Sequence, residues 1–329
     1  MMIDQDDSPA QEDVGLKRGV ILRSTGSWYQ VSEWETRKVF GCRAGGRMRL
    51  NGERSTNPLA VGDIVRFEAN GITEAGLIIE REERKNAIIR RSVNLSKESH
   101  VVASNLDRAF LIATVSQPST STGFIDRFLV TAEAYGIPTT IVFNKCDLAA
   151  SDGEDADALQ YMKELYEMAG YDVLLVSAQS GQGMPALKAA IAESGVNMLS
   201  GHSGVGKTTL INQLLPGLDL RTGDVSDSHQ KGKHTTTYAE MFPLSSGGYL
   251  IDTPGIKGFG LVQLEKEHLH HYFPEIFALL AECKFHNCLH RSEPKCAVRR
   301  AVEQGVVAEE RYLNYLDLYE NFDAETQYR

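Results

Sequence analysis

Residues 201–208 carry glycines, a lysine and a threonine at a spacing that suits the binding of phosphate groups. They fit the pattern G-x-x-x-x-G-K-[ST]. Closely spaced glycines let backbone N–H groups turn inward around phosphate oxygens, while the lysine adds a positive charge and the hydroxyl reaches a magnesium ion. We therefore expect Lys207 to act on the reacting phosphates and Thr208 to bind magnesium. The expected phosphate contacts come from Gly201, His202, Ser203, Gly204, Val205, Gly206, Lys207, Thr208 and Thr209.

Residues 144–147 read Asn-Lys-Cys-Asp and have the form N-K-x-D, which is typical of guanine selection. A carboxylate at Asp147 can accept hydrogen bonds from N1–H and the exocyclic amine of guanine, a pair that adenine does not present. Alone, the motif is equally typical of a polar turn after a strand. A second strand-like run, 172–176, leads into a companion loop for the guanine carbonyl. The predicted base contacts are Asn144, Lys145, Asp147, Ser177 and Ala178.

The order of these two motifs is unusual, because the base motif follows the phosphate loop in ordinary GTPases. Here residues 144–147 precede residues 201–208. The order indicates a nucleotide switch that is circularly permuted. Its switch loops would then lead directly into the domain that follows.

A further phosphate motif lies at residues 252–255, Asp-Thr-Pro-Gly. We expect Asp252 to hold magnesium through water and the N–H of Gly255 to meet the γ-phosphate. Residues 232–237 lie between this motif and the phosphate loop and include three threonines, of which Thr236 is expected to complete the magnesium shell. A threonine run by itself is more typical of a plain strand, so its position between two phosphate motifs carries the interpretation.

The next residue is Ile256, where related enzymes place a glutamine that orients the attacking water. Isoleucine cannot orient water, so hydrolysis is expected to be slow unless another group takes part. His234 is the nearest candidate by sequence for this catalytic role. The alternative is a solvated loop histidine with no part in the reaction.

Three of the five cysteines fall within residues 283–296. Three thiolates and one imidazole make a closed tetrahedral set that suits a structural zinc ion and leaves no position for a catalytic water. Disulfides are the competing interpretation, but they would leave the histidine unexplained, and nothing in the chain indicates export. His290 is favoured over His286 as the histidine. The predicted zinc ligands are Cys283, Cys288, His290 and Cys296.

The elements that must position these residues follow from the hydrophobic pattern. Between residues 109 and 251, apolar and β-branched runs of strand length alternate with helical patterns such as 124–135, which is typical of an α/β domain with a parallel sheet. The phosphate loop would lie between a strand at 196–199 and a helix at 209–215. The final stretch, including a helix from 309 to 319, is mainly helical, and its tyrosines are expected to pack in a core.

Before that domain, residues 16–81 contain five short strand-like runs separated by turns, which indicate a small β-barrel. An OB-fold that binds RNA is the economical choice, since basic residues cluster at 37–49 and again at 81–97, and the aromatics Trp28 and Tyr29 could stack on bases. The alternative is a barrel used for packing alone, with these aromatics in its core.

Composition agrees with several domains: the chain has 329 residues, 42% of them hydrophobic, and a net charge of −10 that disfavours indiscriminate nucleic-acid binding. No apolar run approaches the length of a membrane span, and the acidic start is unlike a secretory leader, so we expect a cytoplasmic protein. We also expect a monomer. The expected divisions are a flexible tail at 1–15, the OB-fold at 16–100, the permuted GTPase domain at 101–262 and a zinc-binding helical domain at 263–329.

With these motifs in this order, the chain resembles the RsgA/YjeQ family of circularly permuted bacterial GTPases. The resemblance covers nearly everything after the tail, and the departure at His202, where the family usually has glutamine, falls at a variable position. It implies binding to the small ribosomal subunit (30S) through 16S ribosomal RNA, assistance in its late maturation, and hydrolysis of GTP to GDP stimulated by that subunit. Two other classes stay open: a nucleotide-operated binding module with incidental hydrolysis, and an ATP-dependent enzyme acting on a small molecule.

Overall fold

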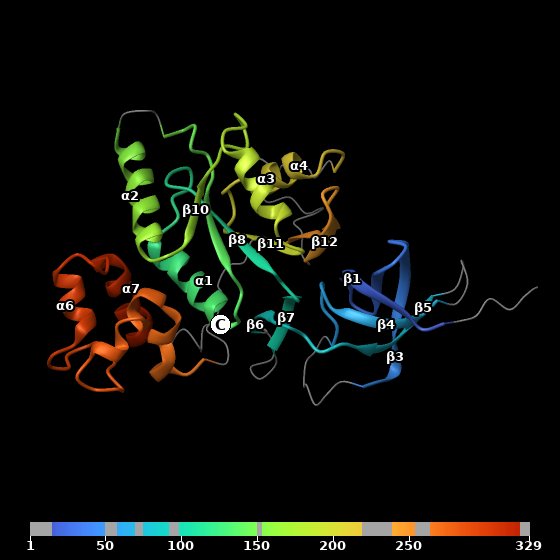
Figure 1. Ribbon diagram of the computed structural model, residues 1–329. Helices are drawn as coiled ribbons and strands as arrows, with labels where there is room; N and C mark the ends of the chain where they lie inside the picture. Colours follow the sequence, from blue (N-terminus) through green and yellow to red (C-terminus); the bar gives the residue numbers. More distant parts are fainter. Residues whose placement is uncertain are drawn as a thin grey trace, which may run out of the picture.

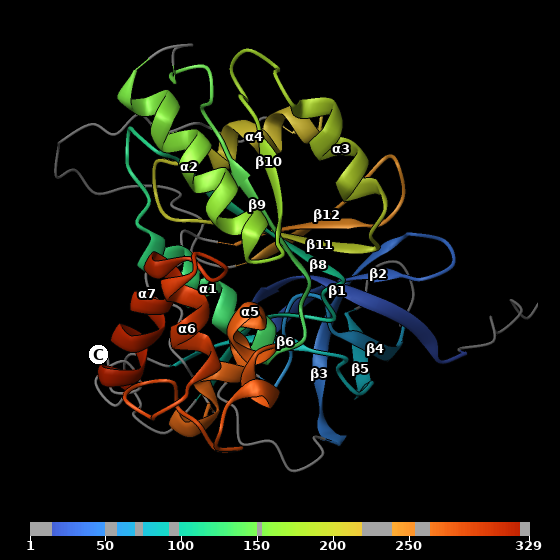
Figure 2. The same cartoon turned by 60° about the vertical axis from the view of Figure 1, so that its left-hand side comes forward.

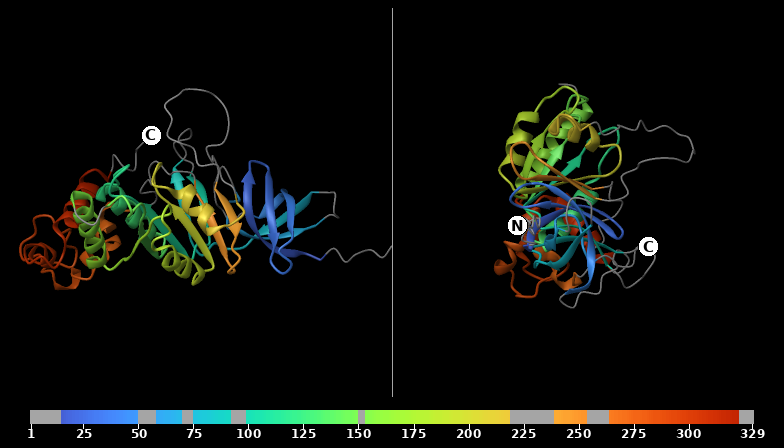
Figure 3. Two further views of the ribbon diagram at one scale, coloured as in Figure 1. Left: turned by 90° about the horizontal axis from the view of Figure 1, so that it is seen from above. Right: turned by 90° about the vertical axis from the view of Figure 1, so that its right-hand side faces the viewer.

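The computed structural model describes residues 15–49, 58–69, 75–91, 99–149, 153–218, 239–253 and 264–322. Three parts follow one another along the molecule, as Figure 3 shows from above: a β-barrel at one end, an α/β domain in the middle and a helical region at the other end. One sheet of eleven strands runs through the first two parts in the order β10-β9-β8-β11-β13-β12-β1-β2-β3-β5-β4.

The barrel contains the five strands expected from the sequence, and an additional pairing of β1 with β4 closes their circuit. Alternate side chains fill its centre, among them the fully buried Ile21, Val31 and Phe67. The strands are β1 (Lys17–Thr25), β2 (Trp28–Glu33), β3 (Val39–Arg49), β4 (Ile64–Glu68) and β5 (Gly76–Arg81).

The two aromatics at the start of β2 have different environments. Trp28 is 41% exposed, whereas Tyr29 is 3% exposed and lies in the barrel core. Successive strand residues point to opposite faces, so the ring of Tyr29 lies in the core while that of Trp28 faces outward. The prediction that Tyr29 stacks on bases from an exposed face is therefore wrong. For Trp28, which is exposed, it stays a prediction.

The central domain has a sheet of five parallel strands: β8 (Arg108–Ala113), β9 (Thr139–Phe143), β10 (Asp172–Leu175), β11 (Val196–Ser200) and β13 (Tyr249–Asp252). Helices α1 (Thr122–Ala134) and α2 (Glu154–Met168) cover one face, and α3 (Met184–Ala192) and α4 (Lys207–Leu214) cover the other (Figures 1 and 2). Alternate residues of β8 enter the two cores, Leu111 toward α1 and Ile112 toward α3. The expected α/β domain is confirmed.

Two connecting elements were not expected from the sequence. Strands β6 (Ala87–Arg91) and β7 (Ser99–Ser104) form a separate two-stranded sheet between the barrel and β8. Strand β12 (Glu240–Pro243) runs antiparallel to β13 and also pairs with β1, through Glu240 opposite Arg23. This single register pair joins the barrel's strands to those of the α/β domain.

The C-terminal region consists of short helices that pack on α1, as Figure 2 shows. They are η1 (Lys266–Tyr272), α5 (Pro274–Phe277), η2 (Leu280–Glu282), α6 (Ala297–Glu303) and α7 (Glu309–Glu320). Tyr315 of α7 is 0% exposed and lies in the core of this region, so the prediction that the tyrosines of this helix pack rather than bind a cofactor is confirmed for it.

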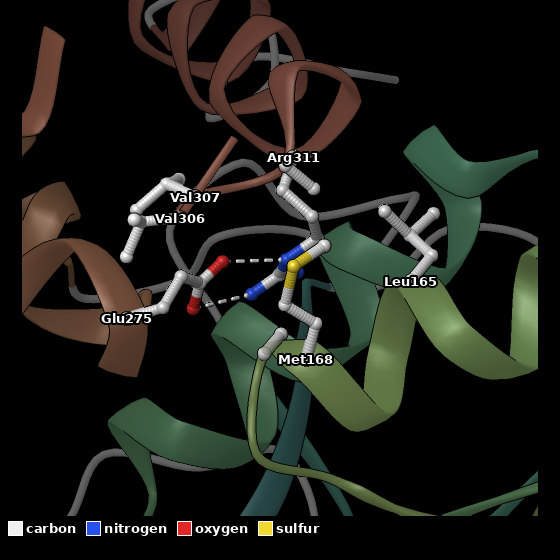
Figure 4. Close-up of a pocket in the computed structure, with 8 residues that line it drawn as sticks. Leu165, Met168, Glu275, Val306, Val307 and Arg311 are labelled. Atoms are coloured by element: carbon white, nitrogen blue, oxygen red, sulfur yellow. Dashed lines mark hydrogen bonds and ion pairs between the residues drawn. The ribbon is translucent and has the colours of Figure 1, made fainter. Parts of the chain in front are cut away.

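A buried cation joins the helical region to the α/β domain. Arg311 of α7 is 1% exposed; its guanidinium donates to Asp126 of α1 at 2.6 Å and to both carboxylate oxygens of Glu275 of α5 at 2.7 and 3.0 Å. Figure 4 shows the two bonds to Glu275 beside Met168 of α2. None of the helices described is long and apolar enough to cross a bilayer.

Candidate functional site

The five parallel strands end at one edge of the sheet, and the predicted nucleotide motifs follow directly after them. Because all the carboxyl ends of parallel strands face the same way, their loops converge at that edge. The loops begin at Thr114 after β8, Asn144 after β9, Val176 after β10, Gly201 after β11 and Thr253 after β13. Segments from 114 to 253 are thus brought together although they are far apart in the sequence.

The phosphate loop bends sharply between β11 and α4 because two of its glycines lie where a side chain has no room. Gly206 has φ of 91°, and a Cβ there would lie 2.4 Å from Nδ2 of Asn144. A Cβ at Gly201 would lie 2.4 Å from the carbonyl oxygen of Ile112. The helix α4 begins at Lys207, so the N–H groups of its first turn point toward the loop.

Asn144 ties the base motif to the phosphate loop. The buried side chain donates from Nδ2 to the carbonyl of Val205 at 2.8 Å, and its Oδ1 accepts from the N–H of Ala178 at 3.1 Å. One amide therefore spans three of the predicted motifs. The geometry adds a structural task to the base contact expected for Asn144 from the sequence.

Half-buried Lys207 and buried Asp252 are two charged side chains at this edge. Burial lowers the pKa of the Lys207 amine, against the opposing effect of Asp252. Burial raises the pKa of the Asp252 carboxyl to about 6, opposed by Lys207 and assisted by the nearby charge of Glu240. Nζ of Lys207 donates to the carbonyls of Gly201 and His202 at 2.6 and 2.9 Å. The lysine thus lies within the loop whose phosphates it is expected to contact.

The loop after β8 contacts both the phosphate loop and the base motif. The sequence did not indicate a role for it. Thr120 Oγ1 lies 2.7 Å from Nε2 of His202, and Nζ of Lys145 donates to the carbonyl of Gln117 at 2.5 Å. This loop lacks a recognisable motif, so its position after a β-strand of the parallel sheet is the signal that could have revealed it.

Exposure divides the remaining predicted base contacts. Asp147 is exposed, while Ser177 and Ala178 are buried at 0% and 4% exposure. In the phosphate loop, Ser203 and Gly204 are exposed, Val205 is buried in the core beneath the loop, and Thr208 and Thr209 are half-buried on α4. His234, Thr236, Gly255 and Ile256 lie outside the described residues, so their predicted roles stay predictions.

A second site lies in the helical region, where four side chains of the predicted metal set converge. One ligand atom from each of Cys283, Cys288, His290 and Cys296 lies within 4.8 Å of the others. Nδ1 of the histidine lies 3.6 Å from Sγ of Cys283 and 3.4 Å from Sγ of Cys296. A tetrahedral site with metal–sulfur bonds of about 2.3 Å needs ligand separations near 3.8 Å, so these residues fit a metal ion. His286 is exposed and outside the cluster.

Backbone geometry around this cluster is held by side chains of α7 and by one carboxylate. The hydroxyls of Tyr312 and Tyr315 donate to the carbonyls of His290 and Leu289 at 2.6 and 2.7 Å. Glu293 accepts from the N–H groups of three residues of the same loop, which lower the pKa of its carboxyl below its usual range against the effect of burial. The spaced tyrosines of α7 therefore position the loop that carries the histidine.

A groove of about 360 Å³ opens on the outside of the barrel. The guanidinium of Arg43 lies 4.1 Å from the ring centre of Trp28 at its rim. Not every basic residue of the two predicted clusters is free for a ligand: Arg84 is paired with buried Asp63 at 2.6 Å and serves the barrel itself. The groove is lined by Arg23, Thr25, Trp28, Tyr29, Gln30 and Gly41.

Comparison with known proteins matches both folded units before the helical region. Residues 81–262 match the family model described as RsgA GTPase, and residues 18–78 match the RsgA N-terminal domain. The small ribosomal subunit biogenesis GTPase RsgA of Bacteroides fragilis is 50% identical over 312 residues, which cover 95% of this chain and 99% of that protein. The protein of the same name from Christiangramia forsetii is 49% identical and covers 92% and 96%.

Solved structures agree over the same length. The crystal structure of YjeQ from Thermotoga maritima superposes with a TM-score of 0.75 at 33% identity and covers 95% of this chain and 99% of its own. That of YloQ, described as a circularly permuted GTPase, gives 0.73 at 31% identity and covers 96% and 98%. The chain, with its base motif before its phosphate loop in a permuted α/β domain, belongs to the RsgA GTPase family.

Proposed function

We propose that this chain is a GTPase that binds the small ribosomal subunit through 16S ribosomal RNA, assists the subunit's late maturation and hydrolyses GTP to GDP and phosphate with stimulation by the subunit. The observation that carries the nucleotide part is the pair of hydrogen bonds of the Asn144 amide, which donates to the carbonyl of Val205 and accepts from the N–H of Ala178. They support one composite site in which base and phosphate motifs meet. The ribosomal part rests on the names of the relatives at 49% and 50% identity.

In this site Asp147 accepts from guanine, and the loop at Ser177 and Ala178 borders the guanine carbonyl. The N–H groups of residues 201–209 surround the phosphates, and Lys207 places its charge against the β- and γ-phosphates. Thr208, Thr236 and Asp252 are the residues that would hold magnesium, directly or through water. Bound magnesium would neutralise charge on the phosphate oxygens. The N–H of Gly255 would meet the γ-phosphate.

The attacking water needs a group to orient it, and Ile256 cannot provide one. We propose His234 for this role, brought into place when the subunit binds. Its imidazole can accept a proton or hydrogen bond from water at neutral pH. Slow hydrolysis by the free protein and fast hydrolysis on the subunit follow from this arrangement.

We propose that the metal is zinc and that it is structural. Cys283, Cys288, His290 and Cys296 supply four ligands, and a closed set of three thiolates and one imidazole suits zinc. Bound zinc would supply folding free energy to a region of short helices with a small core. Around it, exposed basic residues could meet RNA phosphates: Lys284, Arg291, Lys295, Arg299 and Arg300.

The barrel groove is the second proposed RNA surface. Trp28 is exposed and capped by Arg43 at 4.1 Å, a pair that can stack on an unpaired base while Arg23 meets a phosphate. The acidic average charge of the chain makes such contacts local, so binding would be directed to a defined RNA surface rather than to any polyanion. Because bacterial ribosomes are assembled in the cytoplasm, we propose that the protein works there. We also propose that the protein is a monomer.

Co-sedimentation tests the proposal: the protein is centrifuged with purified 30S or 50S subunits in the presence of a non-hydrolysable GTP analogue or GDP. We expect pelleting with 30S and the GTP analogue, and little with 50S or GDP. Multiple-turnover hydrolysis is measured in parallel with parent and His234→Ala protein. Turnover unaffected by 30S subunits would favour the binding-module alternative, and competition of ATP with GTP at equal strength would favour the ATP-dependent one.

A further inference from the structure

We propose that His270 is a positioning residue of the metal centre, which accepts a hydrogen bond from the outer nitrogen of the metal ligand His290. This inference rests on the proposed metal set but assigns a residue of a different element, η1, to it. His270 lies outside every motif that the sequence indicated. It is 18 residues beyond Asp252, at the far side of the segment that follows the phosphate motif.

The first observation is the orientation of His290. Its Nδ1 faces Sγ of Cys283 and of Cys296, at 3.6 and 3.4 Å, so the imidazole would bind the metal through Nδ1. A neutral imidazole that binds a metal through one nitrogen carries its proton on the other. That other nitrogen, Nε2, is buried and has no hydrogen-bond partner among the described residues. The metal-bound form of His290 therefore presents a buried donor that needs an acceptor.

The second observation is that His270 offers the complementary group. Its side chain is 5% exposed, and its Nδ1 is also buried and without a partner in the described parts of the chain. The backbone of Glu267 forms a hydrogen bond with the same ring. A neutral imidazole carries one N–H, and because Nδ1 is the atom without a partner, we assign the proton to Nε2. Nδ1 is then a lone-pair acceptor.

The third observation places the two rings together. The ring centres of His270 and His290 are 5.3 Å apart and the ring planes are inclined by 82°. The two nitrogens do not bond to each other in this structure, but rings this close allow them to reach the bonding distance of about 3 Å once the metal fixes the proton of His290 on Nε2. Nε2 of His290 and Nδ1 of His270 are thus two buried nitrogens without partners on adjacent rings, and each can supply the partner that the other lacks. A buried donor or acceptor without a partner destabilises the folded state, so a bond between the two rings would remove both penalties.

The consequence is that the metal set is anchored to η1 as well as to its own loop. A histidine ligand whose outer N–H is held by a carbonyl, carboxylate or imidazole keeps its tautomer and ring angle, and loss of such a partner costs about 10–100-fold in metal affinity. The relay runs from the backbone of Glu267 through His270 to His290. Metal loading would thereby hold η1, the first described element after Asp252, against the cysteine loop.

His270→Phe provides the test, because phenylalanine keeps a planar ring in the buried space but has no acceptor. Zinc affinity of the full-length protein is measured by competition with a chromophoric chelator, and cobalt is substituted to record the thiolate charge-transfer and ligand-field bands. We expect His270→Phe to bind one metal ion about 10–100-fold more weakly than the parent and to shift the ligand-field bands. GTP affinity should be unchanged.

Two exposed histidines of the same helix serve as matched controls. His268→Ala and His271→Ala remove imidazoles that pack near His270 but lie at the surface, and both should keep parental zinc affinity. Where His270→Phe does not fold, His270→Gln and His270→Ala decide, since glutamine retains an acceptor oxygen. Affinity near the parent's in the glutamine variant and a loss in the alanine variant support the proposal.

The outcomes distinguish the role of His270 from the existence of the metal set. Parental zinc affinity and parental cobalt bands in His270→Phe would overturn the role of His270 while leaving the metal set intact. A parent protein that takes up neither zinc nor cobalt would overturn the metal set and this inference with it. An equal loss of affinity in His270→Phe and His271→Ala would assign the effect to general packing of η1 and also overturn the proposal.

Discussion

At the scale of single residues, the nucleotide site depends on side chains that perform structural and binding tasks together. Asn144 is the clearest case, since its one amide group is bonded to two loops. Asp147 is different: it is exposed, and its carboxylate makes no hydrogen bond or ion pair with another residue in the described parts of the chain, so it is available for a base. Substitutions at the two positions should therefore have different signatures.

Asp147→Asn should change base choice without changing stability. The amide cannot accept from both guanine donors, so we expect GTP affinity to fall by about 1–3 kcal/mol while ATP affinity stays the same or rises. Equilibrium titration with fluorescent GTP and ATP analogues measures the ratio. Undiminished GTP affinity would remove the guanine assignment of this loop.

Asn144→Ala should weaken nucleotide binding and lower stability together. Two buried backbone groups, on Val205 and Ala178, would lose their partner at about 1–3 kcal/mol each. Asn197→Ala is the matched control, because Asn197 is a fully buried asparagine that donates to Ile191 at the opposite end of β11. It should lower the unfolding free energy but leave GTP affinity at the parental level. A similar loss of GTP affinity in both variants would contradict the bridging role.

At the scale of elements, the helical region is docked on α1 through a charge that has almost no access to water. Arg311 neutralises Asp126 and Glu275, and Asn314 adds a 2.7 Å bond to Asp126. A buried ion pair adds little net stability compared with an apolar replacement, but removing one partner leaves uncompensated buried charge. The network therefore specifies how α5 and α7 sit on α1.

Arg311→Met should lower the unfolding free energy by about 3–5 kcal/mol, because the buried carboxylate of Asp126 and the half-buried one of Glu275 lose their cation. Urea denaturation monitored by circular dichroism measures the change. Arg291→Met is the control, since its partner Glu320 is exposed and such pairs contribute about 0–1 kcal/mol. Adding Asp126→Asn and Glu275→Gln to Arg311→Met should recover part of the loss. A triple variant as unstable as the single one would show that the charges are not the cause.

At the scale of the whole molecule, the barrel is joined to the α/β domain through β12 and β13, the strand that ends at Asp252. Strand β12 carries Glu240 directly opposite both Arg23 of the barrel and Asp252 of the phosphate motif, and the Arg23–Glu240 pair is 3.7 Å long. Arg37 of the barrel also stacks on Tyr249 of β13 at 4.8 Å. On the other side, η1 is the first described element after Asp252 and Thr253. The barrel groove, which Arg23 lines, thus adjoins the strand that carries Asp252.

Cys288→Ser should release the metal and unfold the loop from about residue 283 to 296, since a small region of short helices depends on its ion for folding free energy. GTP binding should persist, because the nucleotide residues belong to a different core. Binding to 30S subunits and subunit-stimulated turnover should fall together. Metal analysis, fluorescent GTP titration and turnover with added subunits measure the three effects. Loss of zinc with full stimulation would contradict the proposed part of this region in ribosome binding.

The sequence by itself determined the features that are local along the chain. Gly206 indicates a turn that only a residue without a Cβ can make. The spacing of cysteines and histidine at 283–296 indicates a ligand set, since residues so near in sequence are also near in space. The five barrel strands and the alternation of strands with helices followed from hydrophobic period in the same way.

Only the tertiary structure decided which distant groups meet. Trp28 and Tyr29 are equivalent in a sequence pattern, but closure of the barrel places one outside and the other in the core. Contacts between distant positions were decided in this way. His270 and His290 are 20 residues apart, and Asp126 and Arg311 are 185 residues apart; the bonds of Asn144 fall between these two separations. Such pairs leave no period or spacing in the chain. They arise because burial forces polar groups on separate elements to find each other as partners once the cores have assembled.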